Sequence, residues 1–261
     1  MKPFSPQPKK SLGQNYLTDE NICRNIVTAF NIKPEDFIVE IGPGKGAITK
    51  YIIEQTKNYV GVELDKNIFT LLKEKFPEIN FIRGDFLKLD LYSTLRTPHS
   101  ALRIIGNIPY NITSEILFKL LDERKFISSA QLMIQEEVAQ RIIAKPNTKQ
   151  YGIPSVQLQA FASVKLLFKV SRNCFYPKPK VSSRVVEIDF TKSMDDKIID
   201  VEFFRKLVRM SFSTRRKILK NSLSGLKMNL DEVDFDFSRR AESLSVEEFI
   251  KLSNQLFSMN K

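Results

Sequence analysis

The chain has 261 residues, of which 41 are basic and 30 acidic, so its formal net charge is +11 and its pI is about 9.5. Its 42% hydrophobic and 27% charged residues form a globular balance that excludes wholesale disorder. Two cysteines, one histidine (His99) and no Cys/His cluster argue against a disulfide framework, a zinc site or a Ser-His-Asp triad. No apolar run reaches about 18 residues and the first residues lack a signal-peptide core, so we expect a protein of the reducing cytoplasm.

The positive charge is concentrated at two places along the chain. Lys2, Lys9 and Lys10 precede the first acidic residue, Asp19. Residues 203–221 hold seven basic residues and no acidic one. Because lysines and arginines that bind phosphates release condensed counterions, this distribution favours a polyanionic partner.

The first two thirds of the chain alternate between strand and helix patterns. Apolar residues at helical spacing predict a helix over 19–30 after a basic arm. Strands are then predicted over 37–41, 59–64, 79–84, 102–106 and 130–134, with helices over 46–56, 66–76, 113–122 and 135–144. This alternation predicts an α/β fold whose mostly parallel sheet is covered by helices on both faces. The segments 164–170 and 184–190 are predicted to form a hairpin at the end of the sheet.

The pattern changes near Thr191, after which only helices are predicted. One helix covers 201–212 and another 214–223, with Gly225 as its stop signal. The last begins at Ser245, whose S-x-x-E spacing to Glu248 matches a capping box. We therefore predict two domains, residues 1–190 and a helical domain of residues 191–261.

A glycine-rich segment, EIGPGKG at 40–46, follows the first predicted strand of the sheet. Its glycines allow a tight turn and close approach of a ligand to a helix N-terminus. A Walker P-loop is excluded, because Val39 and Gly46 stand where glycine and Ser or Thr are needed. Two interpretations remain open: a G-x-G-x-x-A dinucleotide fingerprint, or an acidic-x-G-x-G-x-G loop that resembles the S-adenosylmethionine loop of Rossmann-like methyltransferases. In both, Glu63 after the second strand is placed to bind ribose hydroxyls.

The tetrapeptide Asn107-Ile108-Pro109-Tyr110 directly follows the predicted strand 102–106. Carboxyl ends of parallel strands form the ligand edge of an α/β sheet, so this loop should face the glycine loop. An adenine amine is a poor nucleophile, because its lone pair is delocalised into the ring. The Asn oxygen and a backbone carbonyl can accept its two hydrogens and direct the lone pair at a methyl donor. Proline stiffens the turn, and the tyrosine offers a face on which an extruded base stacks.

These residues match the N-x-P-Y motif of amino-group nucleic-acid methyltransferases, and the chain resembles the rRNA adenine dimethyltransferase family. The other matching motifs are KSLGQNYL at 10–17, RGD at 83–85, Tyr151-Gly152, FYPKPKV at 175–181, Phe212, RRK at 215–217, Asn221, RAE at 240–242 and Leu244-Ser245. Position 16 is more often Phe than Tyr in the family. The resemblance covers roughly residues 9–257.

The resemblance implies a Rossmann-like class I methyltransferase fold with S-adenosylmethionine as methyl donor and no metal. The C-terminal domain would be all-α and would bind RNA or the ribosome. The implied cofactor-binding residues are Asn15, Leu17, Gly42, Gly44, Glu63, Asp85 and Asn107. The implied catalytic residues are Asn107, Pro109 and Tyr110, with Tyr110 and Phe175 on the target base. The RNA-binding residues would be Lys9, Lys10, Arg215, Arg216, Lys217 and Lys220.

The implied reaction is dimethylation of two adjacent adenosines in the 3′-terminal hairpin loop of small-subunit (16S) rRNA, during subunit biogenesis. The implied partners are the small ribosomal subunit and its rRNA, with no membrane involved and the chain acting as a monomer in the cytoplasm. Three alternatives stay open. They are a large-subunit rRNA methyltransferase of the macrolide-resistance type, a mitochondrial transcription-factor relative, and a nicotinamide oxidoreductase, for which the glycine loop and Glu63 would serve.

Overall fold

The computed structural model describes residues 6–95, 102–214 and 216–259, so His99 and Arg215 lie outside the described residues. The chain forms two compact units. Unit 1 comprises Met1–Glu136 and Lys165–Asp189, and unit 2 comprises Glu137–Val164 and Phe190–Lys261. Unit 2 resumes at Phe190, next to the predicted boundary. It also contains Glu137–Val164, which the sequence placed in the first domain.

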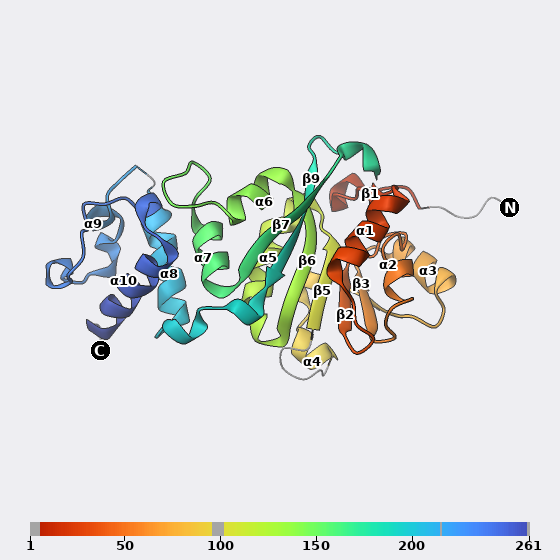
Figure 1. Ribbon diagram of the computed structural model, residues 1–261, viewed down its shortest axis with the longest axis horizontal. Coiled ribbons are helices and arrows are strands. Elements are labelled where there is room, and N and C mark those ends of the chain that lie inside the picture. The colour runs from red at the N-terminus through yellow and green to blue at the C-terminus, as the bar shows by residue number, and fades with distance from the viewer. Residues whose placement is uncertain (1–5, 96–101, 215, 260–261) are drawn as a thin grey trace. The chain divides into compact units, whose positions relative to one another are not determined.

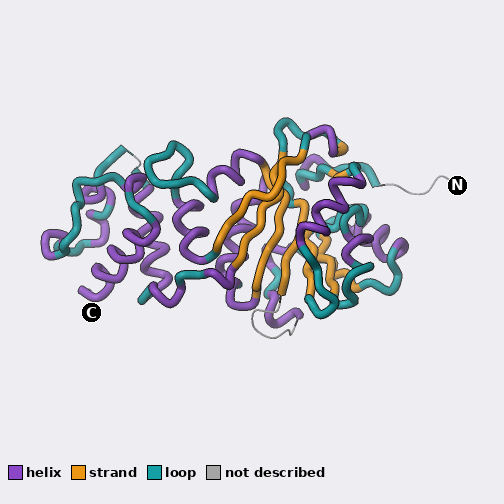
Figure 2. The backbone as a smooth tube through the Cα atoms, viewed as in Figure 1, coloured by secondary structure: helices purple, strands orange, loops and turns teal. Residues whose placement is uncertain are grey.

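A single seven-stranded sheet is the frame of unit 1 (Figures 1 and 2). Its strands are β2 (Phe37–Ile41), β3 (Tyr59–Glu63), β4 (Asn80–Arg83), β5 (Leu102–Asn107), β6 (Ile127–Gln135), β7 (Ser163–Val170) and β9 (Ser183–Asp189). The spatial order is β4-β3-β2-β5-β6-β9-β7. The neighbours from β4 to β6 pair in parallel, and β9 pairs antiparallel with β6. The predicted α/β fold is confirmed, and the two last strands lie side by side at one end as predicted.

The strands are apolar along their whole length because both faces of the sheet are covered. Side chains alternate between the faces, so Ile38 packs into a core cluster with α1 (Glu20–Phe30), α2 (Thr49–Ile52) and α3 (Lys66–Lys75), while Val39 points the other way. Figure 1 shows α1 in front of the strands and α5 (Thr113–Asp122) behind them. The short α4 (Leu91–Leu95) was not predicted. Helix α2 is shorter than the predicted 46–56 at both ends, and Gly46 lies outside it because its φ of 77° does not fit a right-handed helix.

The strand order reverses beside β2, which pairs with β3 on one side and β5 on the other. The loops that follow β2 and β5 therefore diverge, and such a switch point opens a crevice for a ligand. Gly106 allows the two strands to approach closely there, since a Cβ would lie 2.8 Å from the carbonyl oxygen of Ile41. A separate two-stranded ribbon of β1 (Tyr16–Leu17) and β8 (Phe175–Tyr176) was not predicted.

Unit 2 is helical apart from the first residues of β7. It contains most of α6 (Glu136–Ile142) together with α7 (Ile153–Phe161), α8 (Val201–Phe212), α9 (Leu219–Ser222) and α10 (Val246–Met259). The rings of Phe161 and Phe204 meet edge to face at 5.8 Å, which is how α7, absent from the prediction, joins α8. The helix predicted over 214–223 is reduced to α9. In the described segments of both units, no helix is long and apolar enough to cross a membrane.

The capping box predicted for the last helix is confirmed. The backbone N–H of Ser245 donates to the Glu248 carboxylate at 2.8 Å, and the N–H of Glu248 donates to Ser245 Oγ at 3.2 Å. Glu248 also pairs with Arg239, whose Nη2 donates to it at 3.1 Å. These bonds satisfy backbone donors at the start of α10 that have no partner within the helix.

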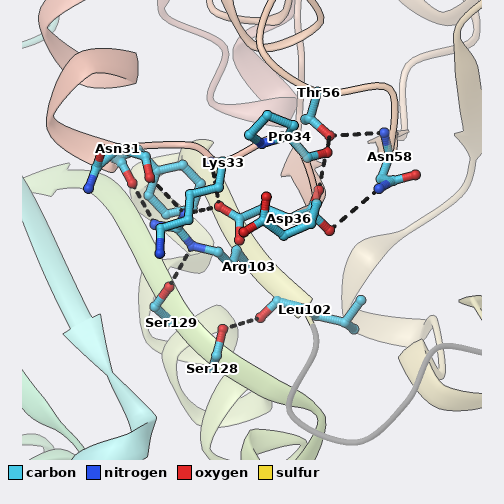
Figure 3. Close-up of polar contacts among 12 residues, drawn as sticks. Asn31, Lys33, Pro34, Asp36, Thr56, Asn58, Leu102, Arg103, Ser128 and Ser129 are labelled. Carbon is cyan, nitrogen blue, oxygen red and sulfur yellow. Dashed lines mark hydrogen bonds and ion pairs between the residues drawn. The ribbon is translucent and has the colours of Figure 1, made fainter.

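At the amino-terminal edge of the sheet, Arg103 joins three elements (Figure 3). Its guanidinium donates to the carbonyl of Asn31 at 3.1 Å, to Ser129 Oγ at 3.2 Å and to the Asp36 carboxylate. It also lies 4.2 Å from the centre of the Phe30 ring. Because the side chains of Arg103 and Asp36 are only 18% and 16% exposed, solvent screens this pair weakly.

We expect the Arg103→Met variant to lose about 3 kcal/mol of unfolding free energy in urea denaturation, since it leaves a largely buried carboxylate and backbone carbonyls unpaired. Arg103→Lys serves as the matched control and should lose less, because it keeps the charge but not the forked geometry. A loss below about 0.5 kcal/mol for Arg103→Met, the size typical of surface substitutions, would contradict this role.

Candidate active site

A cavity of about 280 Å³ opens at the carboxyl-terminal edge of the parallel strands. The loops after β2, β3, β4 and β5 line it, together with residues 11–18 and Tyr176, all within unit 1. The predicted site residues that it brings together are Asn15, Leu17, Gly42, Gly44, Glu63, Asp85, Asn107, Pro109 and Tyr110. The position and lining of the cavity therefore follow from the strand order.

The glycine loop approaches the cavity with an exposed backbone. Gly42, Gly44 and Gly46 have φ values of 62°, 57° and 77°, a region that side chains with a Cβ rarely adopt. A Cβ on Gly42 would meet nothing within 4 Å, whereas one on Gly44 would lie 3.2 Å from the Tyr16 ring. Gly42 thus leaves open space for a ligand, while Gly44 lets the Tyr16 ring pack against the loop.

Two carboxylates with different surroundings lie along the next loops. Glu63 is 5% exposed, and its oxygens accept the N–H of Gly44 at 3.2 Å and of Asp65 at 2.8 Å. Burial raises the pKa of Glu63, and these backbone bonds offset part of the rise. Asp85 accepts the N–H of Leu87 at 3.0 Å. Each carboxylate keeps lone pairs that can accept from a ligand.

Asn107 is oriented by a residue 92 positions earlier in the chain. Its Nδ2 donates to the backbone carbonyl of Asn15 at 2.9 Å. Since that partner is an acceptor, the amide nitrogen must face it, and Oδ1 remains as an acceptor without a hydrogen bond among the described residues. The carbonyl of Ile108 likewise accepts none from them, whereas that of Pro109 accepts from Ile112 N–H at 3.2 Å and Thr113 Oγ1 at 3.3 Å.

Tyr110 is held at its far end by strand β9. Its hydroxyl and Ser183 Oγ lie 2.6 Å apart, and Ser183 is fully buried. Burial also raises the pKa of the Tyr110 phenol, so the hydroxyl stays protonated. Ser183 is not predicted from the sequence, because the contact joins residues 73 positions apart.

Phe175, predicted to contact a target base, lies in the core with 5% exposure and is not part of the cavity wall. Its neighbour Tyr176 is 59% exposed and lines the cavity. The physical reason is the alternation of side chains in β8, which turns Phe175 inward and Tyr176 outward. The role assigned to Phe175 stays a prediction.

The predicted RNA-binding cations differ in their surroundings. The ammonium of Lys9 donates to Asp65 Oδ1 at 2.8 Å, and Gln14 Nε2 donates to Asp65 Oδ2 at 3.2 Å, so Lys9 ties the N-terminal segment to the cavity rim. Of the other predicted cations that the structure describes, Lys10 is exposed in unit 1, and Arg216, Lys217 and Lys220 are exposed in unit 2. Within the described ranges, no three His, Cys, Asp or Glu side chains gather as metal ligands would.

Beneath the glycine loop, Glu40 forms a buried hydrogen-bond network that the sequence did not predict. Glu40 is 2% exposed and accepts the hydroxyls of Thr49 at 2.7 Å and Tyr59 at 2.6 Å. Burial raises the pKa of Glu40 to about 7, and the charge of Glu63 adds to the rise. The network joins β2, β3 and α2 under the site.

Comparison with known proteins identifies relatives over nearly the whole chain. The family model described as ribosomal RNA adenine dimethylase matches residues 6–257. A protein of Chlorobium chlorochromatii named ribosomal RNA small subunit methyltransferase A is 47% identical over 94% of this chain and 92% of its own length. The protein of the same name from Chlorobaculum tepidum is 48% identical over 95% of this chain and 89% of its own.

Two solved structures share the fold. A dimethyladenosine transferase from Plasmodium falciparum superposes with a TM-score of 0.75 at 25% identity and covers 94% of this chain and 97% of its own. The 23S rRNA methyltransferase ErmE superposes with a TM-score of 0.68 at 23% identity, over 93% of this chain and all of its own, and supports the fold alone.

The raised pKa of Glu40 predicts how stability changes with pH. Below pH 4.5 the carboxyl is protonated in both the folded and unfolded states, and as pH rises through about 7 the folded state bears a buried charge. The free energy of unfolding of the wild type, minus that of Glu40→Gln, should therefore fall by about 2–3 kcal/mol between pH 5 and pH 8. Urea unfolding at both pH values measures this difference. A difference that does not change with pH would show that Glu40 titrates normally.

Proposed function

The chain belongs to the ribosomal RNA adenine dimethylase family and is an rRNA methyltransferase, and on this premise we propose its substrate and its chemistry. It transfers methyl groups from S-adenosylmethionine to the exocyclic amines of two adjacent adenosines in the 3′-terminal hairpin loop of small-subunit (16S) rRNA. It acts as a monomer on small subunits during their assembly in the cytoplasm. The observation that carries the proposal is the orientation of the Asn107 amide. Its nitrogen donates a hydrogen bond to the carbonyl of Asn15, so its oxygen is left to accept a hydrogen bond from the target amine.

The cavity fits S-adenosylmethionine, which when bound supplies a methyl group on a positively charged sulfonium. The Glu63 carboxylate accepts the ribose hydroxyls with the lone pairs that its backbone donors, among them the N–H groups of Gly44 and Asp65, leave open. The Asp85 carboxylate accepts a hydrogen bond from the adenine amine of S-adenosylmethionine, and the methionine end of that molecule occupies the open space beside Gly42. Asn15 and Leu17 close the wall from the N-terminal side.

The two acceptors for the target amine are Asn107 Oδ1 and the carbonyl of Ile108. Neither accepts a hydrogen bond from the residues that the structure describes, whereas the carbonyl of Pro109 is already engaged twice. Accepting both amine hydrogens draws the lone pair out of the ring and aims it at the methyl carbon. These dipoles also face the positive charge that develops on the nitrogen, so they stabilise the transition state more than the ground state.

No general base is required for this reaction. The amine becomes strongly acidic once alkylated and loses its proton to water. The carboxylates of the cavity, Glu63 and Asp85, are therefore assigned to binding, and the rate comes from alignment of amine and methyl group. A second transfer to the same base needs only the one hydrogen that the methylated amine retains.

The target base stacks on the ring of Tyr110, which the bond to Ser183 holds in one orientation. RNA phosphates bind Lys10 in unit 1 and Arg216, Lys217 and Lys220 in unit 2, which are exposed. Arg215 belongs to the same basic run but lies outside the described residues. Lys9 is assigned to the N-terminal segment instead, because its ammonium pairs with Asp65.

Nucleoside mass analysis tests the proposal directly. Wild-type protein, S-adenosylmethionine and small subunits that lack the modification should produce dimethyladenosine near the rRNA 3′ end. Asn107→Ala should lower the rate at least about 100-fold, the size of effect seen when one oxyanion donor is removed, while its urea unfolding remains cooperative. If the wild-type protein leaves the RNA unmodified, the proposed substrate is wrong. If Asn107→Ala keeps full activity, the proposed role of the amide is wrong.

The Tyr110–Ser183 contact predicts coupled effects. Tyr110→Phe keeps the stacking face and Ser183→Ala keeps the fold of β9, but each removes the bond that orients the ring. We expect each to lower kcat/KM about fivefold, the equivalent of one hydrogen bond of ~1 kcal/mol, and the double variant to lose no more than either. The matched control is Ser182→Ala, because the Ser182 hydroxyl makes no hydrogen bond within the described part of the chain. Additive losses would mean that the two residues act separately.

A further inference from the structure

A single cation lies on the wall of the cavity. Lys45, in the glycine loop, is the only lysine or arginine among the described residues that line it, whereas Glu40, Glu63 and Asp85 bring carboxylates. Lys45 is half-buried, so part of its surface is removed from water. Because removing a charged group from water is costly unless another charge compensates, a lysine on this wall suits a ligand that carries an anionic group.

The ammonium of Lys45 lies over an aromatic ring whose own position is fixed. Lys45 Nζ is 5.1 Å from the centre of the Tyr16 ring, which is the range of a cation–π contact. The ring packs against Gly44, and the Tyr16 hydroxyl donates to Gln14 Oε1 at 2.8 Å. Burial raises the pKa of the Tyr16 phenol, so the hydroxyl remains a donor. The ring therefore holds the charge of Lys45 beside the glycine loop.

The backbone N–H groups of the three glycines are already used within the protein. Glycine-rich loops that bind phosphates do so with such N–H groups directed at the anion. Here each glycine N–H has a protein acceptor: Val62 O for Gly42 at 2.9 Å, the Glu63 carboxylate for Gly44 at 3.2 Å, and Pro43 O for Gly46 at 3.0 Å. An anionic group beside this loop therefore needs a donor from a side chain.

We propose that Lys45 binds the carboxylate at the methionine end of S-adenosylmethionine, an assignment that rests on the proposed function. The methionine end carries a carboxylate in addition to its ammonium and its sulfonium. It is assigned to the open space beside Gly42, three residues before Lys45 in the same loop. The Lys45 ammonium donates a charge-assisted hydrogen bond to that carboxylate, and the Tyr16 ring positions the donor. Lys45 thereby selects donors that retain the carboxylate over nucleosides that lack it.

Two other lysines near the glycine loop have different roles. Lys75 donates to the backbone carbonyl of Lys45 at 3.1 Å and lies 5.1 Å from the centre of the Phe76 ring, but it does not line the cavity. Lys9 pairs with Asp65 at 2.8 Å and does not line the cavity either. Among these lysines, the position on the wall is specific to Lys45.

Isothermal titration of the full chain with three ligands tests the assignment. The ligands are S-adenosylmethionine, S-adenosylhomocysteine, and decarboxylated S-adenosylmethionine, which lacks only the carboxylate. Lys45→Gln should raise the Kd for the first two at least about tenfold, the effect of one lost charge-assisted hydrogen bond, without weakening the decarboxylated ligand. Lys45→Arg should retain most of the affinity, because it keeps a cationic donor. The control is Lys57→Gln, which removes an exposed lysine before β3 at the opposite edge of the sheet.

Two results would overturn the role of Lys45. One is an unchanged Kd of Lys45→Gln for S-adenosylhomocysteine. The other is an equal loss for the decarboxylated ligand, which would mean that the lysine supports the loop and not the carboxylate. The wild type gives a test that needs no variant, since equal affinity for S-adenosylmethionine and its decarboxylated form would also overturn the proposal.

The same titrations separate this assignment from the proposed function. If the wild-type protein binds none of the three ligands, the proposed methyl donor is wrong. If it binds S-adenosylmethionine and methylates small subunits while Lys45→Gln behaves like Lys57→Gln, only the assignment of Lys45 is wrong.

Discussion

The parallel alignment of β2, β3, β4 and β5 is the constraint on which the rest of the site depends. Parallel strands end at a common edge of the sheet, so residues from four segments that are far apart in the sequence meet there. Glu63 and Asn107 are the last residues of β3 and β5, and Asp85 lies in the turn after β4. At the other edge Arg103 joins Asn31 after α1, Asp36 before β2 and Ser129 of β6, so this stabilising contact lies at the opposite end of the strands from the cavity.

At this edge of the sheet, the cavity interior and the surrounding surface of unit 1 carry groups of opposite charge. The interior of the cavity presents carboxylates and carbonyls, which suit a cationic methyl donor and an amine that becomes positive. Outside the cavity, unit 1 carries exposed cations such as Lys10, which suit the phosphates of RNA. The charge of Lys9 is neutralised by Asp65.

Local patterns predicted the features that a few neighbouring residues determine. The strands of the sheet were predicted to within three residues, and Gly42, Glu63 and Asn107 line the cavity because each ends a strand or directly follows one. Contacts between distant residues could not be predicted: the β1–β8 ribbon, the Tyr110–Ser183 bond, and the grouping of Glu137–Val164 with the C-terminal helices all depend on tertiary packing. The alternation of side chains in β8, which buries Phe175 and exposes Tyr176, likewise depends on tertiary packing.

The two halves of the proposed base site are held by different interactions. Tyr110 is fixed from the sheet, through a fully buried serine of β9, and so depends on the core. Asn107 is fixed from the N-terminal segment, which is attached by the polar contacts of Lys9 and Gln14 with Asp65 and by the short β1–β8 ribbon. Because that segment also lines the donor side of the cavity, the orientation of the amine acceptor is linked to the wall that contacts the donor. In the proposed reaction, the placement of the two substrates is thereby coupled through one hydrogen bond between residues that are 92 positions apart.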